Sequence, residues 1–260
     1  MMIFAFKLFI TPILIGLVTL AGRRWGAIVS GLLIGLPLTS APISFILAYE
    51  YGPEFASQSA IGNLAGQISN CCFCLAYTLV AKKCDWFISS FSAIAAFLVM
   101  TLALNSFAWQ LVPAVIVLLV VLVLVALVIP RQSLQLKIFS APRWDLPARI
   151  ITATTFVVVL TTVADKLGAQ LSGLISPFPV FSVVFAAFTH SQSGAKAASN
   201  LLRGVVLGSG SYASFFLIVG ALLTHLGIAL TYLMATLVAL AVSGLTLFIT
   251  RMNKPSDRSI

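Results

Sequence analysis

Residues 26–69 read GAIVSGLLIGLPLTSAPISFILAYEYGPEFASQSAIGNLAGQIS, and residues 168–211 read GAQLSGLISPFPVFSVVFAAFTHSQSGAKAASNLLRGVVLGSGS. Aligned without a gap, the two stretches lie 142 residues apart and share 13 identical residues among 44 pairs. The identities include five glycines and one proline, which a leucine-rich composition does not produce by chance. The pattern predicts an internal repeat, and this repeat decides the fold.

The composition is that of a membrane protein. Sixty per cent of the residues are hydrophobic and only 8% are charged, whereas a soluble domain carries about 25% charged residues. Apolar stretches of about 20 residues recur, long enough to cross a ~30 Å hydrocarbon core as helices. The unbroken apolar run Val115–Ile129 lacks the alternation of a membrane β-barrel. We predict an all-α, polytopic helical membrane protein.

Nine spans are predicted, and the basic residues orient them. The spans are Ile3–Leu20, Trp25–Tyr51, Phe55–Val80, Trp86–Leu104, Leu111–Ile129, Ala148–Ala164, Leu167–His190, Ala197–Leu222 and Leu226–Ile249. They place 13 of the 15 Lys and Arg residues on one side, which the positive-inside rule makes cytoplasmic. We therefore expect the amino terminus outside and the carboxyl terminus inside. The net charge of +9 then reflects topology, and no nucleic-acid partner is expected.

An odd number of spans separates the two repeats, so the second repeat is expected upside down relative to the first. Residues 1–108 form the first repeat of four spans. Residues 109–146 form a lipid-facing connector span and a cytoplasmic loop. Residues 147–260 form the second, inverted repeat. Inverted repeats are a frequent architecture of secondary transporters.

Each repeat contains a span with two central prolines. Pro37 and Pro42 interrupt the second span, and Pro177 and Pro179 interrupt the seventh. Proline removes a backbone donor and clashes with the carbonyl one turn earlier, so two broken helices are predicted. Half-helix ends near the midplane bind ligands in transporters; the competing interpretation is a pair of kinks that only shape the bundle. On the first interpretation, the substrate-binding candidates at the breaks are Pro37, Thr39, Ser40, Ser176, Pro179 and Ser182.

Other polar residues within the spans add candidates. Asn63, Gln67 and Asn70 form one stripe on the third span, where amides bind either a neighbouring helix or a substrate. Asn63, Gln67, Asn200 and Arg203 complete the predicted substrate-binding set. Glu50 and His190 are candidates for proton or ion coupling, since ionisable residues inside a membrane are functional candidates by default.

Small residues recur one helical turn apart in the repeats. The pairs Gly62/Gly66 and Gly204/Gly208 occupy equivalent places in the third and eighth spans, and Ala27, Gly31 and Gly35 follow the same spacing in the second. Small residues let helices approach closely. We interpret these positions as helix-packing faces.

No cofactor, metal or catalytic motif is predicted. Cys71 and Cys74 share a helix face, but no nearby residue completes a metal site of the usual ligand number. No phosphate-binding loop, zinc-protease motif or nucleophile elbow occurs. The chain is therefore not expected to be an enzyme.

The second repeat resembles the small four-span GlpM-like bacterial membrane proteins. The resemblance covers about 40 residues, from Phe178-Pro-Val-Phe through His190 to Gly208. It implies a bacterial inner-membrane location and a chain built as a fused, inverted pair of such units.

These features favour a secondary carrier for a small polar or anionic solute, or a lipid headgroup, which works by alternating access between the repeats. The alternatives are a non-transporting partner or assembly factor of an envelope complex and, least favoured, an intramembrane enzyme. The expected partners are the lipid bilayer and a small-molecule substrate. The oligomeric state, including a homodimer, is left open by the sequence.

Overall fold

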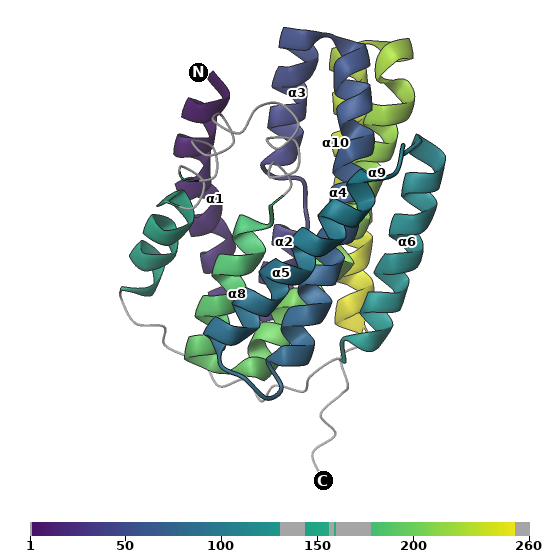
Figure 1. The fold of residues 1–260 in the computed structure, drawn as a ribbon. Coiled ribbons are helices and arrows are strands. Elements are labelled where there is room, and N and C mark those ends of the chain that lie inside the picture. The colour runs from purple at the N-terminus through teal and green to yellow at the C-terminus, as the bar shows by residue number, and fades with distance from the viewer. Residues whose placement is uncertain (1, 131–143, 156–158, 160–177, 253–260) are drawn as a thin grey trace.

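The computed structural model describes residues 2–130, 144–155, 159 and 178–252. Within these residues the fold is all-helical and contains no strand (Figure 1). The helices are α1 (Met2–Trp25), α2 (Ala27–Ile34), α3 (Ser40–Tyr51), α4 (Pro53–Val80), α5 (Trp86–Asn105), α6 (Leu111–Val128), α8 (Val180–Ser193), α9 (Ala195–Leu226) and α10 (Ile228–Met252). Residues 145–155 are also helical.

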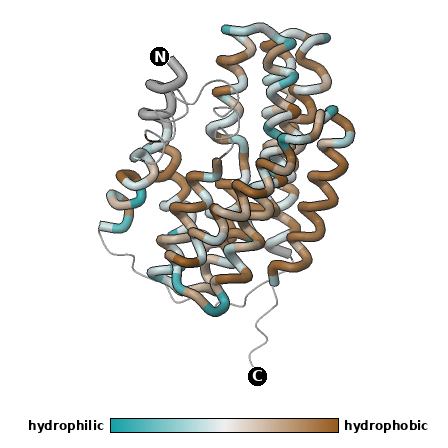
Figure 2. The backbone as a smooth tube through the Cα atoms, in the orientation of Figure 1, coloured by the Kyte–Doolittle hydropathy of each residue, from teal (hydrophilic) through white to brown (hydrophobic). Residues whose placement is uncertain are grey.

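Four of the described helices are long and apolar enough to cross a membrane, by length and composition: α5, α6, α9 and α10. Figure 2 shows hydrophilic residues gathered at the two ends of the bundle, with hydrophobic residues between them. The 28-residue α4 is long enough but less apolar, because it carries Asn63, Gln67 and Asn70. The helices α2, α3 and α8 are short because proline-containing segments border them.

The break predicted at Pro37 is confirmed. The helix α2 ends at Ile34 and α3 begins only at Ser40. Between them, the Leu38 amide donates to the Leu36 carbonyl at 2.8 Å, which closes a tight turn around Pro37.

The second proline segment has the same local geometry. The helix α8 begins directly after Pro179, whose φ of −82° and ψ of 60° are those of an inverse γ-turn. The Val180 amide donates to the Phe178 carbonyl at 2.9 Å. Residues 160–177, including Ser176 and Pro177, lie outside the described residues, and with them the other half of the predicted break.

The 142-residue spacing recurs in the backbone. The helices α4 and α9 begin at Pro53 and Ala195, and α5 and α10 begin at Trp86 and Ile228. The corners before α4 and α9 are Gly52 and Gly194, with φ of +91° and +83°. Glycine adopts this conformation without the strain that a Cβ would add, so the two aligned glycines make equivalent helix–helix corners.

The two equivalent corners lie at opposite ends of the bundle. In Figure 1 the chain turns from α3 into α4 at the upper end, whereas it turns from α8 into α9 at the lower end. The helices α4 and α9 pack against each other and run in opposite directions (Figure 1).

The helix α9 is the centre of the bundle and contacts α2, α4, α6, α8 and α10. The predicted packing of small residues is confirmed where α2 crosses it. A Cβ built on Gly31 would lie 2.9 Å from the Gly204 Cα, and one on Gly35 would lie 2.7 Å from the Gly208 Cα. The two backbones therefore touch, as small residues allow between membrane helices.

The packing role predicted for Gly62 is wrong, because a Cβ at this position meets nothing within 4 Å. The purely lipid-facing role predicted for the connector span needs correction as well. One face of α6, which includes Ala114, Leu118, Leu122 and Val125, is buried. The neighbours of α6 are α4 and α9. A helix made only of apolar residues carries no periodicity that would reveal this face.

Candidate functional site

The α4–α9 interface is joined by a buried hydrogen bond between aligned positions. The Gln67 Nε2 donates to the Ser209 Oγ at 2.6 Å, and the two residues are 142 positions apart. Both are buried, and Ser209 in turn donates to the Val205 carbonyl. The bond therefore joins two positions that are aligned in the sequence, at the contact between α4 and α9.

One helical turn away, a tyrosine links α4 to the break in the first half. The Tyr212 hydroxyl donates to the Asn63 Oδ1 at 2.9 Å, and the Ser40 side chain lies beside the same hydroxyl. The Asn63 Nδ2 donates to the Ser59 carbonyl of its own helix. The predicted candidates Ser40, Asn63 and Gln67 are thus brought together by Ser209 and Tyr212.

Ser209 and Tyr212 are not among the site residues predicted from the sequence. The signal for them was present in the alignment: Ser209 is the counterpart of Gln67, and Tyr212 is the counterpart of Asn70. We define the core polar cluster as Ser40, Asn63, Gln67, Ser209 and Tyr212.

A second tyrosine holds α3 against α10. The Ser44 and Tyr232 hydroxyls are hydrogen-bonded at 2.7 Å, and both residues are buried. The Tyr232 ring also meets Phe45 edge-on, with 5.2 Å between the ring centroids. This contact positions α3, and with it Ser40 at its first residue.

The structure places the other break candidates near the helix ends. Pro37 is buried in the break, and half-buried Thr39 precedes α3 without a side-chain cap. Pro179 is buried at the start of α8, and Ser182 is buried in its first turn. Asn200 is buried on α9.

Arg203 lies away from the core polar cluster. Its guanidinium donates to the carbonyls of Ala126 and Ile129, at the carboxyl-terminal end of α6. Nine residues separate it from Tyr212, roughly 13 Å along the axis of α9. A cation at this place satisfies carbonyls that the end of a helix leaves without partners.

The two coupling candidates lie at opposite ends of the bundle. Glu50 is exposed near the end of α3. His190 is in the last turn of α8, with its Nδ1 3.3 Å from the hydroxyl of buried Tyr77. Neither residue contacts the core polar cluster in the hydrogen bonds of the described residues.

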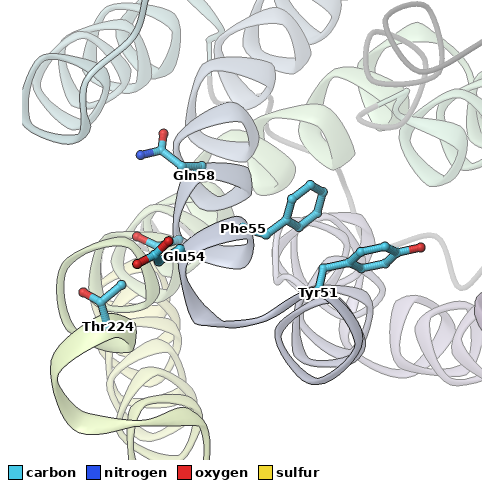
Figure 3. A pocket seen from close by; sticks show the side chains of 6 residues that line it. Tyr51, Glu54, Phe55, Gln58 and Thr224 are labelled. Atoms are coloured by element: carbon cyan, nitrogen blue, oxygen red, sulfur yellow. The ribbon is translucent and has the colours of Figure 1, made fainter.

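An open groove of about 510 Å³ lies at the α3–α4 end of the bundle. It is lined by Tyr51, Glu54, Phe55, Ser57, Gln58 and Thr224. Figure 3 shows Glu54 of α4 near Thr224 of α9, with Gln58 further along α4 and the two aromatic rings on the other side. Beneath the groove, the Ser57 hydroxyl donates to the Gly220 carbonyl at 2.9 Å and joins α4 to α9.

At the opposite end, a buried carboxylate joins three segments of the chain. Asp145 accepts hydrogen bonds from Arg149 at 2.8 Å, from Arg23 at 3.0 Å and from Gln192 at 2.6 Å. Burial raises the pKa of this carboxyl, but the hydrogen bonds from Arg149, Gln192 and Arg23 and the charge of Arg149 outweigh it, so the pKa lies below its ordinary value. The Arg149 guanidinium also lies over the ring of Phe185. This network ties the end of α1 to the 145–155 helix and α8.

No group of three metal-ligating residues occurs in the described part of the chain. Comparison of the whole chain with protein-family models, with curated proteins and with solved structures gives no match. The assignment of a function therefore depends on the geometry of this chain alone.

Proposed function

We propose that the protein is a secondary carrier of the bacterial inner membrane, with nine spans arranged as two inverted repeats. It moves a small polar or anionic solute, or a lipid headgroup, by alternating access. The observation that carries the proposal is the Gln67–Ser209 bond, which joins aligned positions of two antiparallel helices at the centre of the bundle. Such a bond is expected on the axis that relates two inverted halves.

Three further observations support the inversion. The helix starts of α4 and α9, and of α5 and α10, keep the 142-residue spacing. The turns around Pro37 and Pro179 have equivalent hydrogen bonds. The equivalent corners at Gly52 and Gly194 point to opposite ends of the bundle (Figure 1).

The two ends differ in a way that suits a carrier closed on one side. The α3–α4 end has the open groove, whereas the other end is held by the Asp145 network and the Tyr77–His190 contact. On the proposed topology the groove faces outside and the network faces the cytoplasm. The substrate binds between them, where Ser40, Asn63 and Gln67 offer hydrogen-bonding groups and the amino terminus of α3 offers partial positive charge.

Transport is tested with the purified protein in vesicles. Vesicles with and without protein are incubated with a small-molecule extract of the expression host, and their contents are measured by mass spectrometry. We expect at least one polar compound to accumulate with wild type. Ser40→Leu, Ser40→Ala and Ser182→Ala should each reduce that accumulation at least about tenfold, since each removes a hydroxyl that can bond to the substrate.

The control variant is Ser106→Leu, which changes an exposed serine at the end of α5 and should leave accumulation intact. A variant that keeps the size-exclusion profile of wild type is folded, so its loss of accumulation is a loss of transport. Ser40→Ala serves as the smaller substitution if the leucine of Ser40→Leu does not fit the packed interior. Unchanged accumulation in all three site variants would overturn the site. No accumulation with wild type, together with stoichiometric co-purification of another membrane protein, would favour the assembly-factor alternative.

The proposed orientation is tested with the cysteines. Cys84 lies in the turn after α4 and is partly exposed, whereas Cys71 and Cys74 are buried. We expect a membrane-impermeant maleimide to label Cys84 in inside-out vesicles and not in intact cells. In a Cys84→Ser background, Thr224→Cys in the groove should show the reverse. Labelling of both sites from the same side would contradict the topology.

A further inference from the structure

In the described part of the chain, Asn70 is the amide of the α4 stripe whose side-chain oxygen is buried without a hydrogen-bond partner. Asn63 and Gln67 both bond to α9. The Asn70 Oδ1 is buried and has no hydrogen-bond partner there. Buried polar atoms are nearly always bonded, so this acceptor marks a place where a donor is missing.

The proposed repeat predicts which residues face this oxygen. Asn70 is the counterpart of Tyr212, Ser182 is the counterpart of Ser40, and Val205 is the counterpart of Asn63. Because Tyr212 bonds to Asn63 and lies beside Ser40, the proposed duplication predicts that Asn70 faces Ser182 and Val205. Ser182 is 2% exposed and Val205 is fully buried. Valine has no polar side-chain group, so Val205 cannot form with Asn70 the hydrogen bond that Asn63 forms with Tyr212.

All members of the core polar cluster are uncharged. It consists of hydroxyls and amides, and Arg203 is bound to the α6 carbonyls further along α9. A charged ligand taken from water into such a site would lack an opposite charge, which is unfavourable in a low-dielectric interior. A neutral ligand with hydrogen-bonding groups suits the site without this penalty.

We propose that the substrate is a neutral solute with O–H or N–H donors, such as a polyol, urea or a simple amide, and that it donates a hydrogen bond to the Asn70 Oδ1 beside Ser182. This inference rests on the proposed function and narrows its substrate class.

The first test compares two amides of one stripe. Asn70→Leu removes an acceptor that the protein does not use, so the melting temperature of the ligand-free protein in detergent should stay the same or rise. Asn63→Leu removes the acceptor of Tyr212, so the melting temperature should fall. A fall with Asn70→Leu as large as that with Asn63→Leu would show that the protein itself uses the Asn70 oxygen, and would overturn the inference.

The second test measures which solutes cross and bind. Vesicles containing the protein are mixed with glycerol, xylitol or urea in a stopped-flow light-scattering assay, and uptake of labelled phosphate and choline is measured in parallel. We expect flux of a neutral solute with wild type and with the control Gly62→Ala. Asn70→Leu should lower this flux, and the stabilisation of the protein by the same solute, by about tenfold, since one hydrogen bond to the ligand is lost.

The outcomes separate the two proposals. Flux of phosphate or choline without flux of neutral solutes would overturn the neutral class and leave the carrier standing. Thermal stabilisation by a neutral solute that Asn70→Leu abolishes, without any flux, would keep the site and overturn the carrier. No flux and no stabilisation in any arm would overturn both.

Discussion

Gly31→Ala is expected to lower the free energy of unfolding by at least about 3 kcal/mol and to reduce the yield of folded protein severely. The added methyl would overlap the Leu201 carbonyl oxygen and lie 2.8 Å from the Val205 amide nitrogen. Both neighbours are backbone atoms of the central helix, so they cannot rotate aside as a side chain does. Overpacking a well-filled interior costs about 1–3 kcal/mol, and a backbone collision lies at or above the top of that range.

The matched control is Gly62→Ala, a glycine of the same repeat with open space around its Cβ position. Alanine is favoured over glycine inside helices by roughly 0.5–1 kcal/mol, so this variant should be equally or more stable than wild type. Thermal unfolding in detergent, followed by circular dichroism, measures both. Equal melting temperatures for the two variants would mean that α2 and α9 do not touch through their backbones.

Asp145→Ala is expected to destabilise the protein by about 3–5 kcal/mol, the usual effect of removing one partner of a buried ion pair. Arg149 is 7% exposed and would keep its charge without a carboxylate beside it. Replacing Arg149 by leucine in the same chain should recover part of the loss, because the unpaired charge is removed as well. The control Glu50→Ala alters an exposed carboxylate and should change stability by less than about 0.5 kcal/mol.

The pH dependence supplies an independent readout for Asp145. Its pKa in the folded state lies below the ordinary value of about 4. The stabilisation from the carboxylate is therefore complete above that pH and is lost as the pH falls through the folded-state pKa. The difference in melting temperature between wild type and Asp145→Asn should shrink under acid conditions. A difference that stays constant from neutral to acid pH would show that the network does not depend on the carboxylate charge.

The elements predicted best from the sequence were those with strong local causes. Two prolines within six residues interrupt a helix, and the structure separates α2 from α3 at Pro37. The positions of α5, α9 and α10 followed from long apolar runs between polar turns. The spacing of Asn63 and Gln67 also placed them on one face of α4, where the structure has them.

The features that sequence reasoning missed depend on contacts between distant segments. Tyr212 is surrounded by apolar and small residues in the sequence, and only packing brings it beside Ser40 and Asn63. Asp145 lay in a predicted loop, and two of its partners, Arg23 and Gln192, come from distant parts of the chain. The depth of Arg203 in a predicted span makes it a substrate-binding candidate, but its partners are carbonyls at the end of α6, which no local sequence pattern predicts.

The bonds on either side of the Gln67–Ser209 pair are unequal, and under the proposed function this has a consequence for the transport cycle. In a carrier with inverted halves, the outward-open and inward-open forms interconvert when the two halves exchange conformations. Each off-centre contact between the halves is then replaced by the contact that the pseudo-two-fold axis relates to it. The Tyr212–Asn63 bond would then be traded for a pairing of Asn70 with Val205, in which no side-chain hydrogen bond forms. An empty carrier of this kind rests in the form described above, and the incoming solute compensates for the bond given up on the way to the other form.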